Sequence, residues 1–252
     1  MTDQQALFEY VLRLGDDALL LGHRLSEWCS HGPWLEEDLA LTNVALDYIG
    51  RARRLYSYAA EVENRGRTED DLAYLRSERE YRNLLIHELP RGNFAESITR
   101  QFLVDAYNIE FFGELSQSAD PTLSSIASKS VKECQYHLRR SRHWVLMLGD
   151  GTEESHSKMQ RALDDIWGYT QELFTPDELD LRMVGISIGV DVSSLQPAWH
   201  RLVEQTLEQA ALVKPSDDWP IIGGRAGIHT EHLGYLLAEL QYIQRSYPGL
   251  NW

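Results

Sequence analysis

The sequence has little cysteine and proline and no long apolar run. Its two cysteines, Cys29 and Cys134, provide neither a disulfide framework nor a Cys-x-x-Cys metal motif, and both lie in apolar helical context. No stretch reaches the roughly 18 apolar residues that a membrane-spanning helix needs. The polar, acidic N-terminal residues lack the pattern of a signal peptide. We therefore expect a cytoplasmic protein with two buried free thiols and no membrane contact.

Basic residues are also scarce. The chain has 24 lysines and arginines against 39 aspartates and glutamates, a formal net charge of −15. Nucleic-acid binding depends on neutralising phosphates with basic patches, so this balance argues against a nucleic-acid partner. A local basic site for a phosphorylated ligand remains compatible with it.

Helix-forming residues dominate the 252-residue chain, of which 43% is hydrophobic, and patterns of alternating polarity are almost absent. We predict an all-α fold in one domain, residues 1–252, with a core bundle over about 4–149 and extra helices over about 153–252. Residues 64–71 are expected to form a charged loop, and 183–192 to be strand-like or irregular. The helices expected from apolar spacing, caps and prolines are 4–30, 35–63, 77–89, 93–118, 120–149, 153–174, 197–212 and 230–246.

The helix expected over 128–148 resembles a metal-binding helix that has lost its motif. Bundles that hold two irons use Glu-x-x-His on two of their helices, with one further carboxylate from each of the other two. Here His137 has Cys134 three residues before it, and Glu133 is one position too early. Likewise, the residue three after Asp47 is Gly50, which offers no ligand. A two-metal site would be poorly held by this set.

Two interpretations of the polar positions remain open. In one, a stand-alone metal-dependent oxygenase uses Asp47, Asp105, Glu133 and His137. In the other, which we favour, these residues and Asp16 are polar core residues that pair with cations, because a buried charge needs a partner. The arginines expected to serve as partners are Arg51, Arg53, Arg54, Arg100 and Arg139.

Three further features suggest ligand contacts less strongly. His229 and His232 have a spacing seen in metal sites, but Thr230 between them is a good N-cap, and we prefer a helix start. The glycines of 223–227 follow no clear strand, so we interpret them as flexibility at a helix start and not as a phosphate loop. The charged run 77–83 is typical of a solvated helix face, but it could also border a ligand groove. Arg182 could form a surface salt bridge or contact a phosphate group.

Longer stretches carry a resemblance that runs essentially end to end. The chain resembles the PaaC-type structural components of the multicomponent phenylacetyl-CoA epoxidases, a ferritin-like family of bacterial monooxygenase components. The stretches that carry the resemblance are RLGDDALLLGHRLSEWCSHGPWLEEDLALTNVALDYIGRARRLYSYAAE, SEREYRNLL, LPRGNFAESITRQF, KECQYHLRRSRHW and GIHTEHLGYLLAELQYIQRSYPG.

The resemblance implies a ferritin-like four-helix bundle with additional C-terminal helices and no cofactor of its own. The protein would be a structural subunit, without its own active site, that stabilises and orients a homologous catalytic A subunit in which the di-iron centre lies. That partner epoxidises the ring of phenylacetyl-CoA in phenylacetate degradation; a second copy of this chain is an alternative partner. Asp47, Asp105, Glu133 and His137 would be relics of a metal site.

The family also implies that two segments contact the CoA ester at or near the subunit interface. At Arg82 and Arg182 this sequence departs from the small residues that we expect in the family. Exposed tryptophans, Trp34, Trp219 and Trp252, are the expected anchors for the partner. The residues implied to bind the CoA ester are Glu80, Tyr81, Arg82, Asn83, Leu181, Arg182 and Met183.

Overall fold

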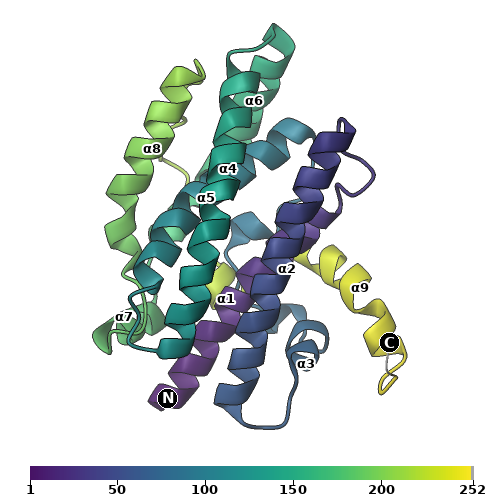
Figure 1. Ribbon diagram of the computed structural model, residues 1–252, viewed down its shortest axis with the longest axis vertical. Helices are drawn as coiled ribbons and strands as arrows, with labels where there is room; N and C mark the ends of the chain where they lie inside the picture. The colour runs from purple at the N-terminus through teal and green to yellow at the C-terminus, as the bar shows by residue number, and fades with distance from the viewer. Residues whose placement is uncertain (251–252) are drawn as a thin grey trace. The chain divides into compact units, whose positions relative to one another are not determined.

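The structure is a computed structural model that describes residues 1–250, and in this range it contains nine α-helices and no strand. The long helices, drawn as coiled ribbons in Figure 1, form where the sequence has apolar stripes. The all-α, ferritin-like prediction is confirmed, and two antiparallel pairs of long helices dominate the fold. No helix within residues 1–250 is long and apolar enough to cross a membrane.

The chain divides into two compact units. The first comprises Met1–Pro90 and the chain from Gly223 onward, and the second comprises Arg91–Ile222. One domain over residues 1–252 remains a prediction.

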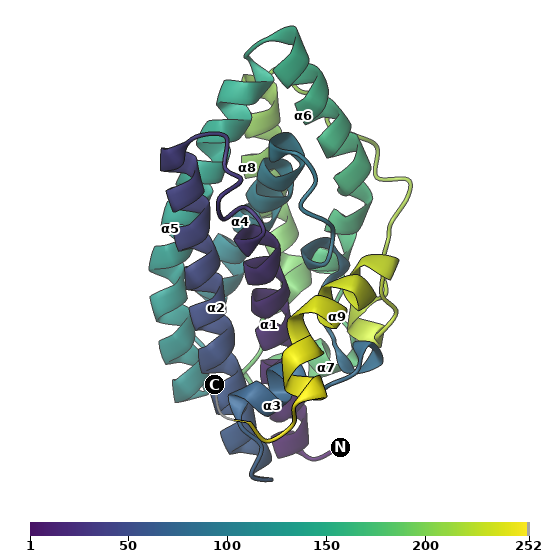
Figure 2. The same ribbon diagram turned by 90° about the vertical axis from the view of Figure 1, so that its right-hand side faces the viewer.

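The first unit is built on the pair α1 (Asp3–Ser26) and α2 (Leu35–Glu63). A capping box between Thr2 and Gln5 starts α1, and Asn64 in the left-handed conformation ends α2. The short helix α3 (Glu69–Tyr74) follows, and the C-terminal helix α9 (Glu231–Ser246) packs against it (Figure 2).

The second unit is built on α4 (Phe94–Leu115) and α5 (Pro121–Gly149), which pack along each other. Helices α6 (Glu153–Ile166) and α8 (Gln196–Gln209) pack against this pair, and α7 (Glu178–Gly185) lies between them in sequence. The buried Trp199 of α8 donates a hydrogen bond from Nε1 to the carbonyl of Leu103 (2.9 Å). Its ring lies 5.6 Å from that of Trp167.

Two local predictions were wrong, and a third holds in one of its alternatives. Residues 64–71 were expected to be loop, but Thr68 and Asp71 form a capping box that starts α3. The stretch 183–192 was expected to be strand-like or irregular; it ends α7 and continues as irregular backbone that turns at Ser187, which has a φ of 60°. Cys29 is exposed because α1 ends at Ser26, whereas Cys134 is buried as expected.

Candidate functional site

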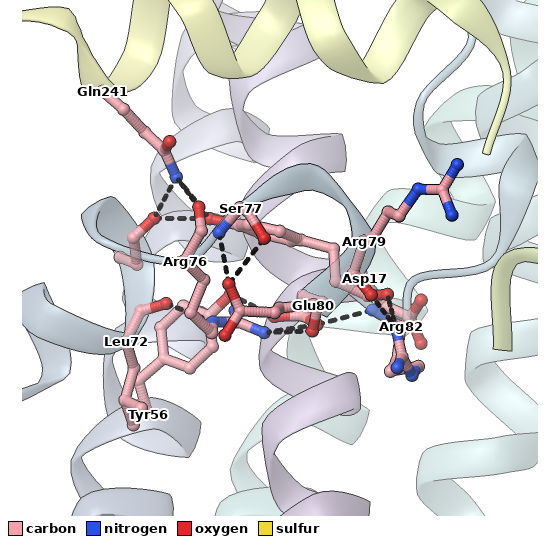
Figure 3. A network of polar contacts seen from close by, with 12 residues as sticks. Asp17, Tyr56, Leu72, Arg76, Ser77, Arg79, Glu80, Arg82 and Gln241 are labelled. Carbon is pink, nitrogen blue, oxygen red and sulfur yellow. Dashed lines mark hydrogen bonds and ion pairs between the residues drawn. The ribbon is translucent and has the colours of Figure 1, made fainter. Parts of the chain in front are cut away.

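Two consecutive aspartates of α1 organise the polar interior of the first unit. Asp16 is fully buried, and the side chain of Asp17 is 14% exposed. Their carboxylates accept the backbone N–H groups of Arg82 and Leu84 in the stretch 80–84, which we call the strap. Figure 3 shows this polar network, with Asp17, Arg76 and Arg82 labelled. We predicted a helix over 77–89, and this prediction was wrong. The segment consists of two 3₁₀ turns, Glu78–Glu80 and Leu85–His87, with an extended stretch between them.

Asp16 holds the first half of the strap. Its carboxylate forms an ion pair with both Nη atoms of Arg76, accepts the hydroxyl of Tyr56 at 2.6 Å and accepts the backbone N–H of Arg82 at 2.9 Å. Burial alone would lower the pKa of the Arg76 guanidinium, but the Asp16 carboxylate outweighs burial and raises it. Burial and the same carboxylate raise the pKa of the Tyr56 hydroxyl well above its ordinary value. Arg76 and Tyr56 therefore stay protonated.

Asp17 holds the second half of the strap. Its Oδ1 accepts the backbone N–H of Leu84 at 2.7 Å and lies 3.1 Å from Nδ1 of His87, while Oδ2 accepts Nη2 of Arg225 at 2.7 Å. Burial would raise the pKa of Asp17, but Arg225 and His87 together lower it to about 2. The carboxylate is therefore ionised at neutral pH, and it joins α1, the strap and the C-terminal segment.

Side chains also bond the carbonyl groups of the strap. Nη1 of Arg76 donates to the carbonyl of Glu80 at 3.1 Å, and Nη1 of Arg225 donates to that of Arg82 at 2.5 Å. The carbonyl of Tyr81 lies 3.1 Å from Nε2 of His229. Helices and sheets satisfy backbone groups with other backbone groups, whereas from Arg82 to Leu84 this stretch is bonded by the side chains of Asp16, Asp17 and Arg225, which are distant in the sequence. These side chains fix its conformation.

Glu88 anchors the start of α9 beside the strap. Its buried carboxylate accepts the backbone N–H of Thr230 at 2.5 Å and lies 3.0 Å from Nδ1 of His229. Burial would raise the pKa of Glu88, but these hydrogen bonds, with one from Asn83, lower it. The two ring nitrogens of His229 face the Glu88 carboxylate and the carbonyl of Tyr81, so the ring bridges the strap and the segment that follows it. Thr230 is the N-cap of α9, as predicted.

We predicted that the glycines of 223–227 provide flexibility at a helix start, and the structure gives them a different role. A Cβ on Gly224 would overlap the carbonyl oxygen of Asn83, and one on Gly227 would lie 2.5 Å from Nη1 of Arg82. Gly227 also has a φ of 76°, in the left-handed region that favours glycine. This turn is therefore shaped to the strap and carries Arg225 against it.

The residues predicted to contact the CoA ester differ in accessibility. In the first unit, Tyr81 and Asn83 are buried, Arg82 is half-buried, and Glu80 is exposed but bonded through its carboxylate to Ser77. In the second unit, the stretch 181–183 lies on α7, with an exposed leucine, a half-buried arginine and a buried methionine. Their role in binding remains a prediction.

The four suspected metal-site relics are divided between the units. Asp47 lies half-buried on α2, while Asp105, Glu133 and His137 belong to α4 and α5 of the second unit. Asp105 is fully buried and accepts hydrogen bonds from Gln101 at 2.6 Å and Ser141 at 2.8 Å. Among residues 1–250, no three His, Cys, Asp or Glu side chains converge in a way that could hold a metal. The interpretation of the four as relics remains a prediction.

Reasoning from the sequence missed the cations that matter most. Asp16 pairs with Arg76, which was not among the expected partners, and Arg53 pairs instead with Glu69 at 3.3 Å. The available signal was a pair of aspartates within the apolar stripe of α1, since a buried carboxylate needs cations. Local sequence does not say which arginine of a long chain folds back to meet it.

Comparisons with known proteins give a consistent result. A family model described as "Phenylacetic acid catabolic protein" matches residues 1–252. The chain is also similar to the C subunit of the 1,2-phenylacetyl-CoA epoxidase of Escherichia coli (strain K12), with 48% identity over 246 residues. That alignment covers 98% of this chain and 99% of the relative.

Proposed function

This chain belongs to the phenylacetic acid catabolic protein family, and on that premise we propose that it is a non-catalytic structural subunit of a phenylacetyl-CoA epoxidase. The resemblance seen in its own residues is confirmed by the comparisons. In this role the chain works in the cytoplasm, where it stabilises and orients a homologous catalytic subunit. That partner carries the di-iron centre and acts on the aromatic ring of the CoA ester.

The chemistry of the potential ligands supports a subunit without its own metal centre. A di-iron bundle needs about six ligands, including two Glu-x-x-His pairs. This chain has Gly50 and Cys134 where a histidine and a glutamate would be needed, and Gln101 and Ser141 already bond the carboxylate of Asp105. The residues do not fit a di-iron site, so no step of the reaction is assigned to them.

One observation carries the proposed contact with the CoA ester. Arg82 lies in the strap and Arg79 immediately before it, and within residues 1–250 the structure shows no ion pair between either guanidinium and a carboxylate (Figure 3). Nη1 of Arg82 donates to the carbonyls of Arg79 (2.6 Å) and Tyr81 (2.7 Å), which orients the group. In a chain with a net charge of −15, a fixed guanidinium without an acid partner suits a phosphate group.

Arg82→Gln tests this contact. The chain assembled with its catalytic subunit is titrated with phenylacetyl-CoA by calorimetry, and loss of a guanidinium–phosphate contact is expected to weaken binding about tenfold. Arg65→Gln is the matched control, because its side chain is 73% exposed and pairs only weakly, at 3.9 Å, with Glu63. If Arg82→Gln left the dissociation constant for phenylacetyl-CoA unchanged, the proposed contact between the strap and the CoA ester would be refuted.

The loop 213–222 supports an anchor for the partner subunit. Trp219 is 82% exposed, yet its loop is fixed: the N–H of Ile221 donates to the carbonyl of Gly168 at 2.9 Å, and Nε1 of Trp167 donates to Asp217 at 2.8 Å. An exposed tryptophan on a fixed loop, such as Trp219, is typical of an interface hot spot. Trp34 is 49% exposed, and Trp252 lies outside the described residues.

Two variants test the anchors. Trp219→Ala and deletion of the chain from Tyr247 onward are expected to reduce co-purification of the catalytic subunit while leaving the urea midpoint of the isolated chain nearly unchanged. Met147→Ala, which truncates another exposed apolar side chain, serves as the control. Normal recovery of the partner with both variants would contradict these anchors.

A further inference from the structure

We propose that Asp17 and Arg225 are positioning residues that fix the strap so that the Arg82 side chain meets its anionic ligand. This inference rests on the proposed function, since the ligand is the phosphate-bearing part of the CoA ester. Neither residue belongs to the segments implied to touch the ester. Both act through the backbone on either side of Asn83.

The contacts of the pair form a clamp around one short stretch of backbone. Arg225 donates from Nη1 to the carbonyl of Arg82 (2.5 Å) and from Nη2 to Oδ2 of Asp17 (2.7 Å). Oδ1 of Asp17 accepts the N–H of Leu84 (2.7 Å). The carbonyl of residue 82 and the N–H of residue 84 are thus held by two side chains that are also bonded to each other.

A second observation points the same way. The turn that carries Arg225 has glycine at the two positions where a side chain would collide with the strap: Gly224 against Asn83, and Gly227 against the Arg82 guanidinium. The turn and the strap are therefore shaped to each other, although about 140 residues separate them in the sequence. A mere surface ion pair would not need this fit.

The energetics favour a positioning role over a purely stabilising one. When both partners of a buried ion pair are replaced by apolar residues of the same volume, the net stability often changes little, although removing one partner alone is destabilising. What a bidentate guanidinium–carboxylate pair adds is direction, because its two parallel bonds fix the mutual orientation of the groups. Here the same two side chains also bond the Arg82 carbonyl and the Leu84 N–H, so the pair fixes the orientation of the peptide groups on both sides of Asn83.

The charged groups around Asp17 are few and defined. Besides Arg225 on the C-terminal turn, His87 faces it from the segment that follows the strap, and Asp16 precedes it on α1 with its own partner, Arg76. Substitution of Asp17 therefore leaves the first half of the strap bonded. The substitution releases only the half that bears the Arg82 carbonyl and the Leu84 amide.

The experiment uses Asp17→Asn and, should it fold poorly, Arg225→Lys, which keeps the charge but loses the two-pronged geometry. Glu63→Gln is the matched control, because Glu63 makes a similar bidentate pair with Arg67 elsewhere in the same unit (2.7 and 2.5 Å). Hydrogen exchange of the strap is measured without ligand. The dissociation constant for phenylacetyl-CoA is measured on the chain assembled with its catalytic subunit.

Asp17→Asn is expected to speed exchange at Leu84 and to weaken binding about tenfold, whereas Glu63→Gln changes neither. The effect must also disappear in an Arg82→Gln background, because a residue that acts through Arg82 has nothing left to position. Additive losses, or unchanged binding with faster exchange, would overturn the positioning role while leaving the proposed function intact. If Arg82→Gln itself binds normally, the proposed CoA contact fails, and the positioning role fails with it.

Discussion

Gly15→Ala tests the packing beneath the strap. Gly15 lies in α1 next to Asp16, and a Cβ there would stand 2.6 Å from Cε1 and 2.7 Å from Cδ1 of the buried Tyr56 ring. Carbon atoms pack at about 3.5 Å or more, so the ring must move by roughly 0.9 Å. If the hydroxyl follows, its 2.6 Å bond to Asp16 lengthens to about 3.5 Å and is lost.

The expected loss of stability follows from three contributions. Overpacking costs about 1–3 kcal/mol, and a lost hydrogen bond to a charged group costs about 1.5–3 kcal/mol. Replacing a glycine within a helix by alanine stabilises the helix by about 1 kcal/mol, which offsets part of this loss. We therefore expect Gly15→Ala to lower the free energy of unfolding by about 1.5–5 kcal/mol, measured by urea denaturation of the full chain at neutral pH.

Gly50→Ala is the matched control. Gly50 also lies in the middle of a long helix of the first unit, but nothing lies within 4 Å of the position where its Cβ would be. It should raise the free energy of unfolding by about 0.5–1 kcal/mol through helix propensity and the unfolded state. If both variants shifted stability in the same direction, the account of Tyr56 packed between Gly15 and Asp16 would be refuted.

Three further outcomes are expected. Tyr56→Phe removes a buried hydroxyl bonded to Asp16 and should lower the free energy of unfolding in urea by about 1–3 kcal/mol. Ala211 has a φ of 56° in the turn that ends α8, so Ala211→Gly should raise the urea-derived free energy of unfolding by about 1 kcal/mol. Because the pKa of Asp17 is lowered from 3.8 to about 2, its ionised form stabilises the fold above pH 4, and this stabilisation, about 2 kcal/mol, is lost as the pH falls through 2. The difference in unfolding free energy between the wild type and Asp17→Asn should therefore shrink from pH 5 to pH 2; a constant difference would contradict the ion-pair account.

The long helices were predictable because their signals are local. The helix expected over 35–63 is α2 to the residue, and Asp120 and Pro121 mark the start of α5. Apolar spacing of three and four, a capping side chain and a terminal proline or glycine act within a few residues of where they stand. Tertiary contacts had little to add at these positions.

The strap was not predictable for the opposite reason. Residues 77–89 have helix-forming composition, but between the two 3₁₀ turns the backbone is extended, and distant side chains satisfy its polar groups. Asp16 and Asp17 come from more than 60 positions upstream, and Arg225 and His229 from about 140 positions downstream. No local pattern encodes such partners. The aspartates within the apolar stripe of α1 indicated only that buried cations must exist.

The central claim is that this chain is a subunit without its own metal centre, and its iron content tests that claim most directly. The chain is expressed alone in iron-replete medium, purified and analysed for iron per polypeptide. The account predicts close to none, with iron appearing only when the catalytic subunit is co-purified. About two irons per isolated chain would contradict it, and would make Asp47, Asp105, Glu133 and His137 working ligands.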